Sequence, residues 1–489
     1  CAGIREGRAG ERRHEVLFKS MGMREDCAIN PVDTPLGCRK PITTHEEALE
    51  DFLCLLAEND DGTLPPHMAD MISVIVSEIY TYYSDKERRN NQPKRYERGR
   101  NRLVDEAIER YNIDTSVHRY WYSIVDVLSM EHKEHHLASI AQRFAVPELR
   151  DLIPFNSENI KQYREVRVGS TSQDIISSFK LRIEAAVTKY AILSCPTQLD
   201  VSQAKIAILD IKDICGQSGS QAANKQTSVA YSLGMIAICS GLYQKTTEID
   251  EFNPDYYKYH FDRLTRIQEV PKRLIFDEYH VTAGSPRIRI QTERYMRTGR
   301  KYNIMLSIAS QIFADFDENM LKLASGIWIM GCEDRERADL KARLDLSPSA
   351  IDHLERHLNG PDATGAPFLA LLNMAGSGRH EHFLKNTIGP IKTWAFSTTA
   401  EDTSLRSRLY GRMSPAAARA ALAQRFPRGS AVAEITQRIN EKANQDKSII
   451  LSPADKEKAK SSVIEEMAEE VFNIWVLGNR LEAEYENSL

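Results

Sequence analysis

Two consecutive carboxylates, Asp277 and Glu278, follow a short apolar segment, Arg273–Phe276, that has the composition of a buried strand. In open α/β sheets, ligands bind at the carboxyl ends of the strands, which is where this segment would deliver both acids. There Asp277 could hold Mg²⁺ through water, and Glu278 could act as the general base for a water molecule that attacks a γ-phosphate. The alternative is a strand that runs into an acid capping the next helix, and this segment alone supports both interpretations equally.

A second apolar run, Tyr302–Ser310, predicts the neighbouring strand and delivers Gln311 at its end. In RecA-like motors, a polar residue at this place contacts the γ-phosphate or the attacking water and senses hydrolysis. Just before the run stand Arg297, Arg300 and Lys301. An arginine here, Arg300 or else Arg297, could stabilise phosphoryl charge in an adjacent subunit, and Lys301 is a candidate for nucleotide binding. The alternative for each cation is a solvated charge that closes a helix and favours its dipole.

These side chains need a sheet to position them, and the sequence predicts one. Short apolar runs separated by helical segments favour a buried, mostly parallel sheet. The helices predicted between the runs cover about 222–242, 286–300, 335–344 and 350–358. The runs that predict strands are 204–210, 273–276, 302–310, 324–332 and 368–374.

Helical patterns dominate on both sides of these runs. Thr44–Glu47 has the pattern of a capping box, in which Thr44 accepts from the N3 amide and Glu47 reaches back to the Thr44 amide. Beyond Thr399 the chain is again helical, and its last long helix is predicted from Ser452-Pro453 to about Gly478. We therefore expect part of a core in 1–42, a mostly helical insertion in 43–196, the main core in 197–400 and a helical extension in 401–489.

The amino-acid composition disfavours several classes of protein. The 489 residues carry a formal net charge of −5, which does not suggest a dedicated nucleic-acid binder. The eight cysteines form no C-x-x-C pair, which favours scattered thiols in a reducing, cytoplasmic compartment. The most apolar stretch, Ser232–Tyr243, is too short for a membrane span. The basic stretch 86–102 is interpreted as an exposed loop, and contact with nucleic acid, an acidic partner or lipid headgroups is the alternative.

The order of strand, Asp-Glu, helix, basic turn, strand and Gln resembles the large type IV secretion and conjugation ATPases of the HerA/FtsK-related group. Ile29–Asp33 resembles the "iNP" segment of that family. Ile208–Asp210 and Ala324–Gly331 resemble strands that precede and follow its Walker B strand. Trp394–Asp402 resembles the closing strand and helix start of its IcmB/DotO branch, which serves Dot/Icm systems.

This resemblance implies a partial RecA-like P-loop NTPase core with a large all-helical insertion and a helical C-terminal extension. It implies ATP and Mg²⁺ as cofactors and a homo-hexameric ring at the cytoplasmic face of the bacterial inner membrane. Its partners would be other secretion ATPases, inner-membrane channel subunits and exported effectors, and hydrolysis between subunits would power assembly or export. The alternatives are a DNA-translocating motor of the same superfamily and a non-catalytic scaffold that docks secretion partners.

The sequence departs from the family at the phosphate loop, since nothing in it fits G-x-x-x-x-G-K-[ST]. The glycine-bearing loops Gly216–Ser220 and Gly376–Gly378 lack the Lys-Ser/Thr pair that neutralises phosphates and binds Mg²⁺. In the family this loop precedes the "iNP" segment, so the resemblance implies that it lies upstream of Cys1. We expect the present chain alone to bind nucleotide poorly and to hydrolyse little.

Overall fold

The computed structural model describes residues 16–59, 62–86, 90–168, 173–202, 204–216, 220–358, 360, 365–374, 376–445 and 453–486. The chain folds into two compact units, Leu17–Leu323 and Ala324 onward. The domain boundaries expected at 42, 196 and 400 stay predictions.

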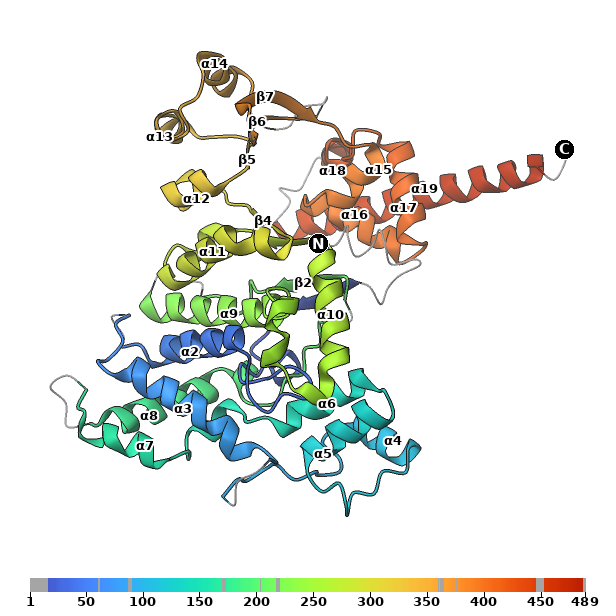
Figure 1. The fold of residues 1–489 in the computed structure, drawn as a ribbon. Coiled ribbons are helices and arrows are strands. Elements are labelled where there is room, and N and C mark those ends of the chain that lie inside the picture. The colour runs from blue at the N-terminus through green and yellow to red at the C-terminus, as the bar shows by residue number, and fades with distance from the viewer. Residues whose placement is uncertain are drawn as a thin grey trace. The chain divides into compact units, whose positions relative to one another are not determined.

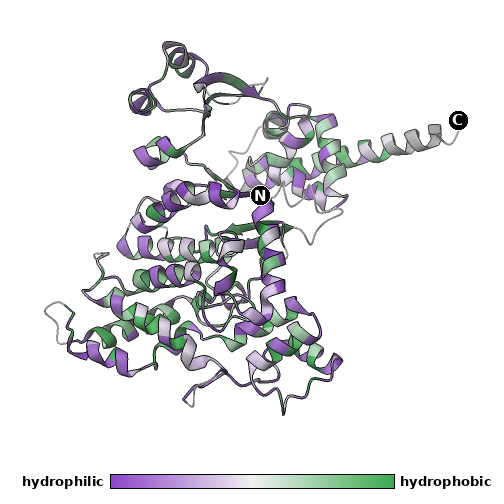
Figure 2. Ribbon diagram, in the orientation of Figure 1, coloured by the Kyte–Doolittle hydropathy of each residue, from purple (hydrophilic) through white to green (hydrophobic). Residues whose placement is uncertain are grey.

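Helices make up most of the first unit between Thr43 and Lys189. Apolar residues at helical spacing, such as Leu53, Ile72 and Phe179, are fully buried and hold α2, α3 and α8 together. Figure 2 shows hydrophobic residues concentrated along these helices. The helices of this region are α2 (Thr43–Ala57), α3 (Met68–Tyr83), α4 (Arg102–Arg110), α5 (Trp121–Asp126), α6 (His135–Ala145), α7 (Glu158–Lys161) and α8 (Ile175–Lys189).

The predicted capping box of α2 is wrong. The helix begins at Thr43, without a side-chain cap. The Thr43 N–H donates to Glu251 Oε2 at 2.7 Å, and Thr44 Oγ1 is buried without a hydrogen-bond partner. A carboxylate remote in sequence therefore accepts a hydrogen bond from a free N–H group at the start of this helix. The local pattern had assigned this capping role to Thr44 and Glu47.

Two small sheets lie in the first unit. The predicted strands around Ile275 and Leu306 form β3 (Lys272–Phe276) and β4 (Ile304–Ile308), which are parallel neighbours as expected. The run around Ile208 forms β2 (Ile206–Asp210), but it pairs with β1 (Val16–Ser20) in a separate sheet. Figure 1 shows α9 between α2 and α11. The remaining helices are α9 (Gln221–Cys239), α10 (Tyr257–Glu269), α11 (Pro286–Thr298) and α12 (Glu318–Leu323).

The second unit corrects the expected single, mostly parallel sheet. The run 324–332 forms β5 (Gly326–Ile329), which pairs antiparallel with β6 (Ala366–Met374), and β6 pairs antiparallel with β7 (Gly378–Asn386). A short turn joins β6 to β7, and its Gly376 and Gly378 have φ of 85° and 81°, which glycine adopts easily. Strands joined by so short a turn must run antiparallel. The helices α13 (Asp334–Leu344) and α14 (Pro348–Arg356) confirm the two predicted between β5 and β6.

The strand expected at Trp394 is a helix instead. Pro390 occupies the first turn of α15 (Pro390–Phe396), where its fixed φ favours a helix start. Trp394 is fully buried in the core of this helical cluster, and its Nε1 donates to the Phe426 carbonyl at 3.1 Å. The cluster also contains α16 (Ala400–Tyr410), α17 (Pro415–Arg425), α18 (Val432–Gln445) and α19 (Pro453–Glu486).

The last helix starts at Pro453 as predicted but continues past Gly478 to Glu486. Within the described residues, no helix has both the length and the apolar character that crossing a bilayer requires.

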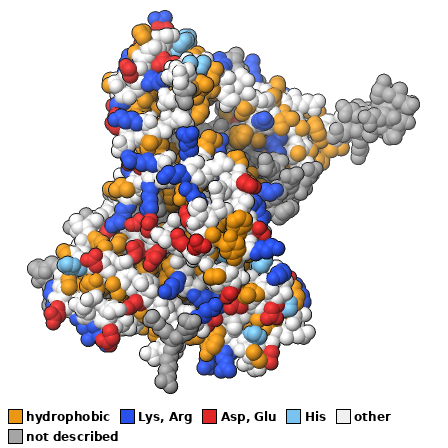
Figure 3. All heavy atoms as spheres, viewed as in Figure 1, with side chains coloured by type: hydrophobic (Ala, Val, Ile, Leu, Met, Phe, Trp, Pro, Cys, Tyr) orange, Lys and Arg blue, Asp and Glu red, His pale blue; other side chains and the backbone are white. Residues whose placement is uncertain are grey.

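The basic stretch is largely neutralised by ion pairs, as far as the structure describes it. Lys86 pairs with Asp255 at 3.3 Å, and Lys94 pairs with Glu148 at 3.2 Å and with Asp151 at 2.8 Å. Arg98 pairs with Glu109, and Arg100 with Glu97 at 3.4 Å. Figure 3 shows Asp and Glu side chains interspersed among the Lys and Arg side chains on the face it presents. Each of these four cations is therefore already paired with a carboxylate.

The segment around Asp33 is held inside the first unit by polar contacts. Asn30 Nδ2 donates to Asp33 Oδ1 at 3.1 Å and to the Pro147 carbonyl at 2.9 Å. Burial raises the pKa of Asp33 from its ordinary value of 3.8 to about 6, against the opposing effects of the Thr197 hydrogen bond and the Arg143 charge. The folded protein therefore keeps a proton on Asp33 in a pH range where the unfolded chain has released it.

We expect this proton to make stability depend on pH. Between about pH 4 and pH 6 the folded state binds more protons than the unfolded state, so the free energy of unfolding falls as the pH rises, by roughly 2–3 kcal/mol in all. Asp33→Asn should remove this loss, which urea unfolding at several pH values between 4 and 8 measures. The exposed Asp250, changed to Asn, is the control that should keep the wild-type slope. An Asp33→Asn profile parallel to the wild-type profile would contradict the assignment.

Candidate functional site

The candidate site lies where β3 and β4 end. The buried Leu274 anchors β3, and the parallel register pairs Phe276 with Ile308, so both strands end at the same edge. This edge carries Asp277 and Glu278 directly after β3. The sheet therefore presents both predicted acids at its carboxyl edge, where open α/β sheets bind ligands.

Glu278 has an unusual backbone conformation. Its φ is 53° and its ψ is 46°, in the left-handed region that Asn, Asp and Gly favour. This conformation turns the chain so that the Tyr279 N–H donates to the Ala309 carbonyl at 2.9 Å, while the Ala309 N–H donates to the Phe276 carbonyl at 2.8 Å. A left-handed non-glycine residue costs of order 1–3 kcal/mol and persists only where its surroundings enforce it. The pairing between the ends of β3 and β4 supplies that enforcement.

Gln311 contacts the second acid directly. Its Nε2 donates to Glu278 Oε1 at 3.1 Å and to Glu278 Oε2 at 2.9 Å. Because an ionised carboxylate only accepts hydrogen bonds, the amide nitrogen is the atom that must face it. Asp277, Glu278 and Gln311, which the sequence assigns to one site, thus lie together at one edge, and the last two touch.

His280 also approaches Glu278, and the sequence analysis did not assign it a role. Its Nδ1 lies 3.2 Å from Glu278 Oε2 but makes no hydrogen bond of good geometry there. A protonated His280 would form an ion pair with Glu278, whereas the neutral ring would not. No spacing rule singles out a histidine two residues after an acid, so the sequence carried no signal for this contact.

The group that Asp277 could hold is a hydrated metal ion. Its side chain is exposed, and Oδ1 accepts from the Glu278 N–H at 3.1 Å, which leaves Oδ2 as a possible ligand. Mg²⁺ in phosphoryl-transfer sites is commonly bound by one or two carboxylates, waters and substrate phosphates. Among the described side chains, no group of three or more His, Cys, Asp and Glu could hold a metal ion. Asp277 therefore fits a shared magnesium site better than an all-protein one.

Near the start of α9, both the glycine and the lysine that a phosphate loop would need are engaged within the chain. In the loop before α9, a Cβ on Gly216 would lie 2.4 Å from Ala223, so this glycine packs against the helix. Lys225, early in α9, donates to the carbonyls of Leu56 and Glu58, both at 3.1 Å. That lysine satisfies the C-terminal end of α2, so it does not serve as a phosphate-loop lysine.

The three predicted cations lie away from the acids within one chain. Arg297 forms an ion pair with Glu293 on α11. Arg300 and Lys301 are exposed in the turn before β4, and the register pairs Ile304 with Lys272 at the start of β3. They stand at the amino end of the strands, roughly 17 Å from the acids for five residues of strand. Any contact with a phosphate at the acidic edge would have to be made in another subunit.

Arg289 is the cation that this chain places near the acidic edge. It donates to the Asp315 carbonyl at 3.1 Å and to Asp315 Oδ1 at 3.3 Å, and its guanidinium lies 5.8 Å from the Tyr279 ring. Ser310, next to Gln311, also donates to Asp315. The sequence analysis missed Arg289 because it stands in the first half of α11, well before the basic turn.

The exposed face of the β3–β4 pair carries two large apolar side chains beside the hydrogen-bonded pair of Arg273 and Ser307. The side chains of Ile275 and Met305 are 65% and 57% exposed, although they lie on adjacent strands. In the described part of the chain, β3 and β4 have no other strand as neighbour. The prediction that these strands are buried is therefore wrong for one face of each.

Comparison with known proteins finds a likeness among solved structures. No protein-family model matches the chain, and no curated protein does. Among solved structures, the chain is similar to VirB4 of Thermoanaerobacter pseudethanolicus, with 14% sequence identity and a TM-score of 0.37. The match covers 79% of this chain and 84% of that one. The residues of the candidate site are assigned from their positions at the ends of β3 and β4.

Proposed function

We propose that this chain supplies the metal-binding and water-activating edge of an ATPase that energises a type IV secretion system, by assembly or by export. The observation that carries the proposal is the hydrogen-bonded pair of Gln311 and Glu278 beside Asp277, at the carboxyl edge of two parallel strands. We choose ATP hydrolysis as the reaction because the sequence resembles the secretion and conjugation ATPases. The finer assignment, to the IcmB/DotO branch and a hexameric ring, belongs to the same proposal.

Each residue has a defined task in this proposal. Asp277 holds Mg²⁺ through water, and bound Mg²⁺ neutralises charge on the phosphate oxygens. Glu278 accepts a proton from the attacking water. The Gln311 amide orients the Glu278 carboxylate, because its Nε2 donates to both carboxylate oxygens.

The cations act between subunits in this proposal. Since Arg300 and Lys301 lie at the far end of the strands from Asp277, they can reach phosphoryl charge only at a neighbour's site. Arg297 would first have to leave Glu293, so Arg300 is the preferred candidate. The proposal also requires a phosphate-binding loop, and no segment of the 489 residues fits the G-x-x-x-x-G-K-[ST] pattern of one.

The test is steady-state ATP hydrolysis by the full gene product under oligomerising conditions, beside the present chain alone. We expect Mg²⁺-dependent turnover by the full product and little by the chain alone, because the phosphate cradle is missing from it. Turnover that persists undiminished when Mg²⁺ is chelated would contradict the role of Asp277. An inert full product would favour a scaffold that docks secretion partners.

The same assay distinguishes a DNA-translocating motor from the proposed secretion ATPase. A DNA motor should hydrolyse ATP several-fold faster when duplex DNA is added, and this stimulation should weaken as salt screens the phosphates. The paired cations of the basic stretch argue against it. We expect no stimulation by DNA.

A further inference from the structure

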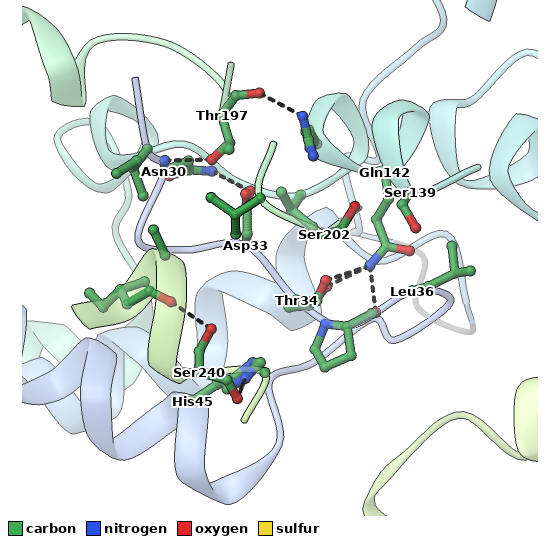
Figure 4. A pocket seen from close by; sticks show the side chains of 18 of the residues that line it. Asn30, Asp33, Thr34, Leu36, His45, Ser139, Gln142, Thr197, Ser202 and Ser240 are labelled. Atoms are coloured by element: carbon green, nitrogen blue, oxygen red, sulfur yellow. Dashed lines mark hydrogen bonds between the residues drawn. The ribbon is translucent and has the colours of Figure 1, made fainter. Parts of the chain in front are cut away.

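The first unit contains a cavity that the proposed ATPase site does not use. It has a volume of about 330 Å³ and lies among α2, α6, α9, α10 and the segments 29–36 and 197–202. This volume is within the range of pockets that bind small molecules. None of Asp277, Glu278 and Gln311 lines it. Figure 4 shows polar side chains from several of these elements around it, including His45, Gln142 and Ser240.

One wall of the cavity carries Arg263, a half-buried cation that forms no ion pair with a carboxylate among the described residues. In the described structure its only hydrogen bond is one of 2.6 Å to Gln244 Oε1, and its guanidinium lies 5.8 Å from the Phe252 ring. Four of the five guanidinium N–H donors are thus left without a protein acceptor. Burial lowers the pKa of Arg263, as expected where no carboxylate compensates for lost hydration.

The other two arginines in this region are paired in the ordinary way. Arg143, which also lines the cavity, lies 3.2 Å from Asp200 Oδ2 and donates to the Thr197 carbonyl at 3.3 Å. Arg39 is held by two carboxylates. A buried charge without a partner is costly, so proteins pair such charges or use them to bind a ligand. Arg263 departs from the pattern of its neighbours and faces a cavity.

The surroundings fix Arg263 in place. Gln244 is only 2% exposed; its Oε1 accepts from Arg263, while its Nε2 donates to the Ser240 carbonyl at 2.9 Å. His45 Nε2 lies 3.1 Å from Gln244 Nε2 and 3.2 Å from the Ser240 carbonyl. Burial lowers the pKa of His45, which keeps the ring neutral and leaves Arg263 as the cation of this wall.

A second unmatched atom lies on the same wall. His260 Nε2 is 2.8 Å from the Leu36 carbonyl, which can only accept, so Nε2 carries the hydrogen. Burial lowers the pKa of His260 to about 4, so its Nδ1 is a bare acceptor at neutral pH. This nitrogen is buried and has no hydrogen-bond partner. The wall therefore offers a guanidinium with only one of its donors engaged and an unused acceptor.

Two carboxylates also line the cavity, but they are engaged elsewhere. Asp200 Oδ1 accepts from the Ser202 hydroxyl at 2.6 Å and from the Ser202 N–H at 2.9 Å, besides the ion pair with Arg143. Asp33 accepts from Asn30, and Figure 4 shows Asp33 beside Asn30 and Thr197, apart from His45 and Ser240. Neither carboxylate forms an ion pair with Arg263.

We propose that this cavity binds a small oxyanion that also bears a hydroxyl group, with Arg263 as its anchor and His260 as an acceptor for the hydroxyl. A guanidinium fork binds a carboxylate or a phosphate through two parallel hydrogen bonds. Inorganic phosphate and a small hydroxy acid both carry an oxyanion and an O–H group. The inference does not depend on ATP hydrolysis.

The test is calorimetric titration of the full chain with inorganic phosphate and, separately, with L-malate. At least one should bind with a Kd of about 1 mM or lower, and Arg263→Met should weaken that binding at least about tenfold. Arg263→Lys keeps the charge but loses the fork, so it should give an intermediate loss. Arg266→Met is the matched control, since Arg266 is exposed on the same helix and does not line the cavity; its binding should equal that of wild type.

Stability separates a ligand anchor from a structural residue. Without ligand, Arg263→Met should leave the melting temperature unchanged or raise it, because it removes a half-buried charge that has no carboxylate partner among the described residues. The proposal is overturned if neither probe binds, if Arg263→Met binds as wild type does, or if that variant melts well below wild type. If Arg266→Met weakens binding as much as Arg263→Met does, the anion binds the surface of α10 rather than the cavity, which also overturns it.

Discussion

Glu278→Gln is expected to lower kcat for ATP hydrolysis by the full gene product at least about 100-fold, the lower end of what a general base contributes. The substitution removes the proton acceptor but keeps the size of the side chain. It also keeps an oxygen that can accept from Gln311 Nε2, as one carboxylate oxygen does now at 2.9 Å. Phosphate release measured at saturating ATP gives kcat, and binding of a fluorescent ATP analogue should stay within about twofold of wild type.

Glu269→Gln is the matched control for this prediction. Glu269 is exposed at the end of α10, within the same unit and shortly before β3, so the same chemical change there should leave kcat unaltered. Wild-type turnover by Glu278→Gln would remove the proposed base. A variant that loses nucleotide binding as well as turnover would point to a structural role for the left-handed turn at Glu278.

Arg39→Met is expected to lower the free energy of unfolding by about 3–5 kcal/mol, the usual cost of removing one partner from a buried ion pair. Arg39 binds Asp85 through Nε at 3.0 Å and through Nη2 at 3.1 Å. It binds Asp126 through Nη1 at 3.1 Å and through Nη2 at 2.6 Å. Its side chain is only 8% exposed and packs over the ring of Tyr122 at 4.5 Å. Removal of the cation leaves two poorly hydrated carboxylates facing each other.

Urea unfolding followed by circular dichroism measures this loss. Arg98→Met provides the control, because Arg98 is 75% exposed and its pair with Glu109 lies at the surface; its free energy of unfolding should stay close to wild type. Adding Asp85→Asn and Asp126→Asn to Arg39→Met should recover much of the loss, since no buried charge then lacks a partner. A loss as small as that of the control would show that water reaches this cluster.

The sequence alone was enough to predict the main features of the acidic edge. Apolar runs of strand length predicted β3 and β4, and parallel strands must end at a common edge, so Asp277 and Gln311 were expected close together. The helices α9, α11, α13 and α14 also follow from periodicity that is local to each segment. The prediction of each helix depends on residues within one or two turns of each other.

The pairing of β5 and the conformation around Trp394 depended on contacts that the periodicity of the sequence does not encode. The run that forms β5 has the same apolar character as β4, yet it belongs to the unit from Ala324 onward, where it pairs with a long hairpin of that same unit. The family resemblance implied a strand at Trp394, but Pro390 starts a helix there, and this helix packs against α17. An apolar run specifies burial, whereas the neighbour that buries it depends on chain connections far away.

The charges show the same division between local pattern and tertiary contact. The sequence located Arg297, Arg300 and Lys301 near a strand but could not show that they stand at its opposite end from the acids. It did not indicate that Arg39 would form an ion pair with Asp126, 87 positions later, or that Arg263 would form none with a carboxylate among the described residues. Ion pairs and unpaired cations arise only when distant segments are brought within hydrogen-bond distance. The sequence by itself thus determined the elements and the chemistry available at their ends, and the tertiary structure decided which charges meet.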